Sequence, residues 1–261
     1  MSNPYQYHYG TQFGVIISDT SDPHYYVGHC YHSFRDWGLY PNEKPVIAPP
    51  TPKTQTVDIP GADGELDFTE SLTGDVKYNN RVGEFKFVFL GDRRQWDATY
   101  HEILNAIHGK RLAVKLDEDN RGFYYGRITV EEPTYKNRRF YLTIAANLEP
   151  YRYDMQTSDE DWIWDDFEFA TDTIRGYTYT LNNEVKIVQV AGSLRSVSPV
   201  ITLGSGGSMN VSYLNYLGVS QTRALVVGDN VFGDLIIRDE TAALAFSGTG
   251  DVAIKFRGGV L

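Results

Sequence analysis

The chain has 261 residues, with 24 Lys and Arg against 34 Asp and Glu, and a net charge of −10. This charge argues against non-specific binding of nucleic acid or anionic membranes, because both need clustered basic side chains. A single cysteine, Cys30, excludes an intrachain disulfide and a multi-cysteine zinc site. No run approaches the roughly 20 apolar residues of a membrane helix, and residues 1–5 lack the basic and apolar regions of a secretory signal.

The composition favours a mainly β chain. There are 19 Tyr, 13 Phe, 4 Trp and 24 Gly, and many short segments alternate apolar and polar residues. Residues 1–25 are polar and aromatic and predict an N-terminal extension or arm, with 12–17 as one strand. Short strands follow over 25–31 and 33–40. The proline-rich run 41–52 favours extended backbone and interrupts sheet pairing.

The stretch 57–70, VDIPGADGELDFTE, predicts a strand, a Pro-Gly turn and a second short strand. Gly61 and Gly64 can take positive φ without a Cβ clash, while Pro60 has a fixed φ and no N–H to donate. The segment therefore bends sharply. It carries no nucleophile–base pair, so its function is expected to depend on shape rather than on reactive groups.

One helix is predicted over about 92–108. Its apolar residues recur at helical period, which predicts one buried stripe packed on a sheet. Asp92 is the expected N-cap and Gly109 the expected C′ residue. After the helix, a charged hairpin is expected at 111–130 and a strand at 140–148. The stripe consists of Trp96, Tyr100, Ile103, Leu104 and Ile107.

The composition changes near Tyr153. From 154 to 168 there are seven acidic residues and no basic ones, interleaved with aromatic residues. We therefore predict a domain boundary near Tyr153, with a first domain over 26–153 and a β-sandwich over 154–261, whose last strand is a candidate to return to the first domain. Strands of this second domain are predicted at 177–181, 185–190, 200–203, 209–213, 223–227, 235–238 and 252–256.

Two segments resemble metal sites without matching one. His24, His29, Cys30 and His32 lie within nine residues, but their spacing fits no standard zinc pattern. The segment 117–122 begins like a calcium loop. Its fifth position is an arginine and its twelfth an isoleucine, where oxygen ligands are needed. Ordinary strand histidines and a charged hairpin turn are therefore expected, with no metal and no cofactor.

Catalysis is not predicted. The acidic-aromatic stretch offers carboxylates of the kind that glycosidases use in pairs, but adjacent acidic residues usually form a solvated surface. Trp162 and Trp164 could instead stack on a sugar or pack in a core. The sequence contains no GxSxG, HExxH, P-loop or dinucleotide motif.

An ordered series of segments resembles the distal tail (Dit) proteins of long-tailed bacteriophages. It begins with GHCYHSFRDWGLY at 28–40 and continues with the Pro-Gly segment 57–67 and YNNR at 78–81. The helix ending in Gly109, the 116–127 hairpin and the close at 149–153 come in the same order. This sequence departs from the family in residues 1–25, which look like an added N-terminal arm. It also lacks the Asn-x-Gly expected before Pro199.

This resemblance implies a mainly β fold. The first domain would be sandwich-like or split-barrel-like with one packed helix, and the second a galectin-like sandwich. It implies a structural, non-enzymatic protein of the virion tail tip, synthesised and assembled in the cytoplasm of the bacterial host. The chain would form a ring, typically a hexamer, that joins the tail tube protein to the tail-associated hub protein and holds receptor-binding proteins. DNA would pass through the ring without specific binding, and no membrane would be involved.

The resemblance and the bend together give the candidate sites. An alternative function is a carbohydrate-binding adhesion module that recognises the bacterial surface through Trp162 and Trp164. We also predict that Gly61→Val impairs ring formation and leaves the second domain folded. The candidate inter-subunit residues are Val57, Ile59, Pro60, Gly61, Gly64, Tyr78 and Arg81.

Overall fold

The structure, a computed structural model, describes residues 10–14, 30–61, 63–71, 74–89, 91–119, 122–154, 158 and 176–261. The chain divides into two compact units. Unit 1 comprises residues 1–152 with residue 261, and unit 2 comprises 153–260. Each unit has its own hydrophobic core.

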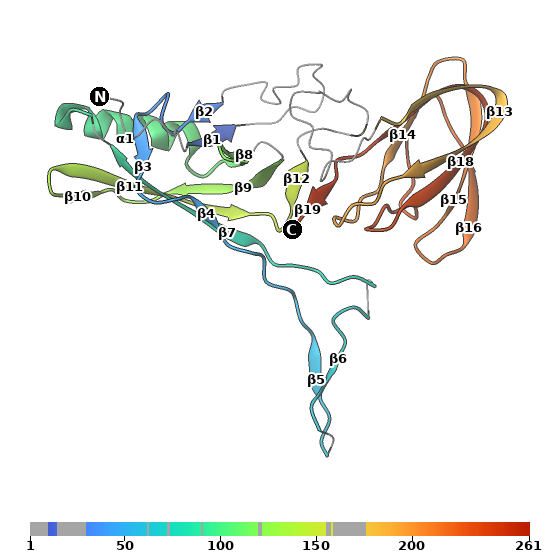
Figure 1. The fold of residues 1–261 in the computed structure, drawn as a ribbon, viewed down its shortest axis with the longest axis horizontal. Coiled ribbons are helices and arrows are strands. Elements are labelled where there is room, and N and C mark those ends of the chain that lie inside the picture. Colours follow the sequence, from blue (N-terminus) through green and yellow to red (C-terminus); the bar gives the residue numbers. More distant parts are fainter. Residues whose placement is uncertain are drawn as a thin grey trace. The chain divides into compact units, whose positions relative to one another are not determined.

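The fold is mainly β, as predicted (Figure 1). The part of unit 1 that the structure describes contains one α-helix, α1 (Trp96–Ile107), which follows the 3-10 turn η1 (Arg93–Gln95). Its strands are β1 (Thr11–Gly14), β2 (Tyr31–His32), β3 (Leu39–Pro41), β4 (Val46–Ile47), β5 (Thr56–Asp58), β6 (Glu65–Asp67), β7 (Arg81–Phe89), β8 (Arg111–Leu116), β9 (Gly122–Val130), β10 (Thr134–Lys136) and β11 (Arg139–Leu148).

The main sheet of unit 1 has the order β2-β1-β8-β9-β11-β7-β3 and is antiparallel. β11 lies between β9 and β7, so that Ile144 is opposite Val130 on one side and Phe85 on the other. β10 pairs with β11, and β4 pairs with β7 beside β3. The chain over 39–48 therefore runs along the outer edge of β7 and covers it.

Helix α1 packs on this sheet through its apolar stripe. Trp96, Ile103 and Ile107 are buried in one core with Phe85 and Ile144. Asp92 accepts a hydrogen bond from the N–H of Arg94, and Gly109 follows the helix with a φ of +73°. A left-handed residue at that position is the usual way to end a helix.

Unit 2 is built around one long strand. β18 pairs with β13 along one edge, while β15 and then β14 pair along its other edge. The six-stranded sheet has the order β16-β15-β18-β14-β17, with β13 also on β18. Its strands are β13 (Thr178–Val190), β14 (Val200–Leu203), β15 (Ser208–Leu214), β16 (Ser220–Ala224), β17 (Gly228–Val231) and β18 (Ala242–Lys255). Two further strands, β12 (Arg152–Asp154) and β19 (Gly259–Val260), pair with each other and are not part of this six-stranded sheet.

The strands of unit 2 differ in part from the expectation. The predicted strands 177–181 and 185–190 are one strand, β13, with a bulge between Asn182 and Glu184. Segment 235–238 forms only an isolated bridge between Ile237 and Val197. β18 begins ten residues before the predicted 252. Gly248 and Gly250 resemble turn residues but lie inside this strand, where a Cβ on Gly248 would be 2.2 Å from the carbonyl oxygen of Ser208.

Candidate functional site: a projecting arm

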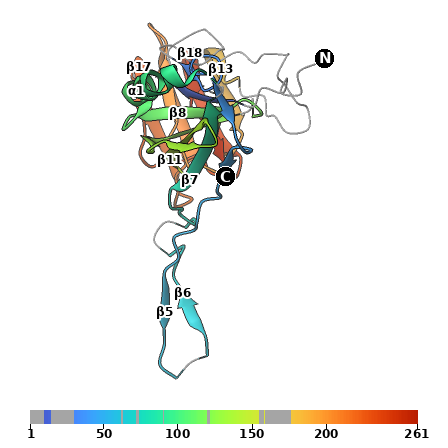
Figure 2. The same ribbon diagram turned by 90° about the vertical axis from the view of Figure 1, so that its left-hand side faces the viewer.

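Residues 48–80 form an arm that leaves unit 1 beside β4 and β7 (Figures 1 and 2). Its two chains are hydrogen-bonded at the base, where the Ala48 N–H donates to the Val82 carbonyl at 3.0 Å. The base extends to Lys53 and Lys77, since Pro52 forms a bridge with Tyr78 and the Lys53 N–H donates to the Lys77 carbonyl at 2.7 Å. The arm therefore continues the register of the sheet edge before it separates from the core.

The outer end of the arm is the two-stranded sheet β5–β6. Val57 pairs with Leu66, and successive residues on each strand face opposite sides. Ile59 follows Val57 by two residues, and Phe68 follows Leu66 by two. These four apolar side chains share one face of the hairpin, and each is 39–48% exposed.

The opposite face of β5–β6 is acidic. Asp58 pairs directly with Glu65, and Thr56 pairs with Asp67. All three carboxylates are exposed, and none forms an ion pair with a basic side chain within the described parts of the chain. The hairpin is therefore amphipathic, with an apolar face that unit 1 does not cover.

The turn at the tip has the backbone that the sequence predicts. Gly61 has a φ of +85° and Gly64 a φ of +78°, in the left-handed region that favours glycine. No heavy atom lies within 4 Å of a Cβ built on either residue. The glycines at the tip thus serve backbone conformation and not close packing.

Below the outer strands, a small hydrogen-bonded turn braces the returning chain. The Thr69 N–H donates to Asp67 Oδ1 at 2.8 Å, and the Gln55 N–H donates to Thr69 Oγ1 at 3.1 Å. Hydrogen bonds from the side chain and the backbone of Thr69 lower the pKa of the Asp67 carboxyl below its ordinary value of 3.8. The Phe68 N–H donates to the Gln55 carbonyl, which ties the two chains together.

The base of the arm is anchored in unit 1 by Tyr78 and Arg81. The Tyr78 ring meets Tyr151 edge-on, with centroids 6.2 Å apart. Arg81 is only 5% exposed, and its guanidinium lies over the Tyr124 ring at 5.2 Å. Its Nε and Nη2 atoms have no hydrogen-bond partner. Burial lowers the pKa of Arg81, whereas the charge and hydrogen bonding of Tyr124 act in the opposite direction.

The predicted site residues therefore fall into three places on one arm. Val57 and Ile59 lie on the apolar face, Pro60 to Gly64 form the tip, and Tyr78 with Arg81 forms the base. Leu66 and Phe68 complete the apolar face, but the sequence analysis did not predict them as site residues. Their two-residue spacing, which matches that of Val57 and Ile59, was the available signal.

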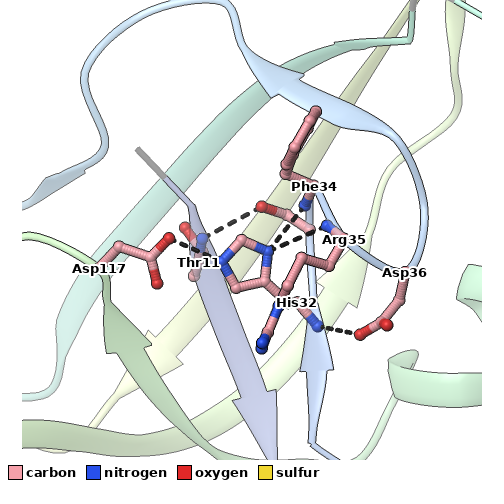
Figure 3. Close-up of polar contacts among 7 residues, drawn as sticks. Thr11, His32, Phe34, Arg35, Asp36 and Asp117 are labelled. Carbon is pink, nitrogen blue, oxygen red and sulfur yellow. Dashed lines mark hydrogen bonds and ion pairs between the residues drawn. The ribbon is translucent and has the colours of Figure 1, made fainter. Parts of the chain in front are cut away.

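A second polar cluster lies around His32 (Figure 3). Its Nδ1 accepts hydrogen bonds from the N–H groups of Phe34 and Arg35, and its Nε2 lies 2.7 Å from Asp117 Oδ2. Both ring nitrogens are therefore engaged, with Nε2 as the donor. His32 is buried and holds the β2–β3 turn against the β8–β9 hairpin.

The acidic hairpin after β8 is held by contacts within unit 1. Asp117 contacts His32, Glu118 pairs with Lys44 at 3.0 Å, and Asp119 pairs with Arg152 at 2.7 Å. Residues 120 and 121 lie outside the described part. These contacts agree with the charged-turn interpretation of 117–122.

Several sequence predictions fall on segments that are not described. Trp162 and Trp164 lie there, as do His24, His29 and residues 1–9 and 15–25 of the N-terminal extension predicted over 1–25. Among the described residues, no group of three or more His, Cys, Asp or Glu side chains could hold a metal ion. The same residues contain no helix of the length and apolarity needed to cross a membrane.

The fold of this chain has a likeness among solved structures. No protein-family model matches the sequence, and no curated protein matches it. The fold is similar to the crystal structure of SPP1 Dit (gp 19.1), described as a paradigm of the hub adsorption apparatus in phages that infect Gram-positive bacteria. The TM-score is 0.56 at 11% identity, over 97% of this chain and 100% of the other. The resemblance to Dit proteins is thus confirmed for the fold.

Proposed function

We propose that this chain is a structural component of a phage tail tip or baseplate, and that copies of it assemble into a ring, a hexamer. The ring would join the tail tube to the tail-associated hub protein and anchor receptor-binding proteins. Residues 26–153 would form the ring, and 154–261 a galectin-like module facing outward. The proposal assigns no catalysis and no cofactor, and DNA would pass through the centre.

The observation that carries this proposal is the arm. A two-stranded hairpin with four half-exposed apolar side chains on one face is only marginally stable by itself. Monomeric proteins rarely expose a contiguous apolar patch of this kind without a binding role. A projecting arm that is covered only by a neighbouring copy is well suited to a ring, where each subunit contacts the next. The likeness of the fold to SPP1 Dit supports the same assignment.

Native mass spectrometry and electron microscopy of the purified chain test the proposal, alone and mixed with the tube and hub proteins of the same phage. We expect closed rings whose mass is six times that of one chain. A chain that stays monomeric at high concentration, with and without those partners, would exclude the assignment. Binding to a bacterial-surface glycan by such a monomer would favour the alternative adhesion module.

A further inference from the structure

The arm carries two like-charge pairs at opposite ends. At the outer end, Asp58 and Glu65 lie directly opposite each other in the β5–β6 register, and Asp67 lies on the same face. Like charges at cross-strand positions are destabilising. A hairpin held by only three residue pairs tolerates this arrangement at a cost, which an external cation would relieve.

The base of the arm has the opposite charge. Lys53 and Lys77 are neighbours across the two chains, joined by the hydrogen bond from the Lys53 N–H to the Lys77 carbonyl. Lys77 has one ion-pair partner, Asp75, at 3.5 Å. Lys53 is exposed and forms no ion pair among the residues that the structure describes. Asp75 offsets part of the charge of this second pair, and an external anion would offset the rest.

The two ends cannot neutralise each other within one copy. Lys53 and Asp58 are five residues apart on an extended chain, which corresponds to about 17 Å. The Debye length is about 8 Å at physiological ionic strength, so the attraction along one arm is largely screened. The three carboxylates of the outer end and Lys53 at the base are therefore available to another molecule, while Lys77 divides its charge between Asp75 and any such partner.

We propose that the acidic face at the tip of one arm, formed by Asp58, Glu65 and Asp67, docks on the lysine pair at the base of the arm of the next copy. The occupant is a second copy of this chain because the complementary charges are both on the arm. The contact is head-to-tail, since tip and base are different surfaces. A heterologous contact of this kind generates a ring when its rotation closes.

This inference rests on the proposed ring and specifies what sets its register. The apolar face remains for the bulk of the contact between copies, while the charges select the partner surface. Electrostatic complementarity across an interface serves specificity and orientation more than raw affinity. The arm thus divides the two tasks between its two faces.

Charge reversal at each end tests the proposal. The tip variant carries Asp58→Lys and Glu65→Lys, the base variant carries Lys53→Glu and Lys77→Glu, and a third chain carries all four changes. Lys53, Asp58 and Glu65 are exposed, Lys77 is half-exposed, and none of them belongs to either hydrophobic core. Each chain is therefore expected to keep the wild-type melting temperature. Native mass spectrometry over a concentration series measures the midpoint of ring assembly for each chain and for an equimolar mixture of the tip and base variants.

We expect each two-site variant to raise the assembly midpoint by at least about tenfold, because like charges then meet at every contact. The mixture and the four-site chain should both restore rings. The mixed ring should alternate the two variants, which requires an even number of copies. Unchanged midpoints in both two-site variants would overturn the inference. It would also be overturned if both variants lost their rings and neither the mixture nor the four-site chain restored them. If the wild-type chain forms no ring, the proposed function fails instead.

Discussion

The substitution Gly61→Val, at the tip of the arm, tests whether the arm can be altered without destabilising either hydrophobic core. The φ of +85° at Gly61 places it in the left-handed region, where a residue with a Cβ costs about 1–2 kcal/mol. A β-branched side chain adds stiffness at χ1. No atom lies within 4 Å of the new Cβ, so the cost is backbone strain and not a clash.

That cost is similar to the stability of the outer hairpin itself. β5 and β6 form three residue pairs, of which Asp58–Glu65 joins like charges. The other two pairs contribute roughly 0.2–1 kcal/mol each, or about 0.4–2 kcal/mol in total. The valine should therefore open the tip without reaching either hydrophobic core. We expect faster amide exchange over Thr56–Asp58, loss of rings in native mass spectra, and a melting temperature within about 2 °C of wild type.

Gly61→Asn is the matched control, because asparagine visits the left-handed region at lower cost. It should keep the ring and the slow amide exchange. Wild-type rings from Gly61→Val at the wild-type midpoint would refute the role of this bend in assembly. A fall in melting temperature of the size that a core substitution gives would refute the independence of the arm.

Four other substitutions give distinct outcomes. Phe85→Ala and Phe246→Ala each empty a fully buried site, in different cores, and should each cost about 3–5 kcal/mol in the unfolding of their own unit only, as measured by calorimetry. Thr69→Val removes the hydrogen bond that contributes most to the low pKa of Asp67, so that pKa should rise toward 3.8 in a carbon-13 NMR titration. Since the folded pKa of Asp67 is depressed, its stabilising contribution is present above pH 4 and is lost as the pH falls through the folded value. Asp117→Ala leaves a buried imidazole N–H without an acceptor and should destabilise unit 1 by about 1–3 kcal/mol in urea unfolding; an unchanged midpoint would contradict the pairing.

The local features of the arm were predictable from the sequence, and its amphipathic character was not fully so. Pro60, Gly61 and Gly64 have conformational requirements that a single residue carries, so their turn could be predicted. The membership of Leu66 and Phe68 in the apolar face depends on which residue of the first strand each opposes. That register follows from the pairing of two strands, which the turn length alone did not give.

Contacts between distant segments account for the other gaps. His32 was interpreted as an ordinary strand histidine, and its partner Asp117 lies 85 residues away. The burial of Arg81 depends in the same way on Tyr124, which β9 brings beside it. In unit 2, the start of β18 was missed because Gly248 and Gly250 resemble turn residues, although their positive φ and close neighbours belong to a strand.

Unit 1 closes the edge of its sheet beside the arm. The outer side of β7 is covered by the short strands β3 and β4, and Pro41 and Pro45 in that covering chain have no N–H to donate to a further strand. Strand addition at this edge is thereby disfavoured. Pro49, Pro50 and Pro52 extend the same property along the outgoing chain of the arm base. In the proposed ring, contact between copies would then be made by side chains at the outer end, where Val57, Leu66 and their neighbours are exposed. An interface made by side chains can distinguish one register from another, whereas an open strand edge accepts many sequences in many registers. A ring with a fixed number of subunits needs the first kind of contact, and the prolines and the amphipathic hairpin together favour it.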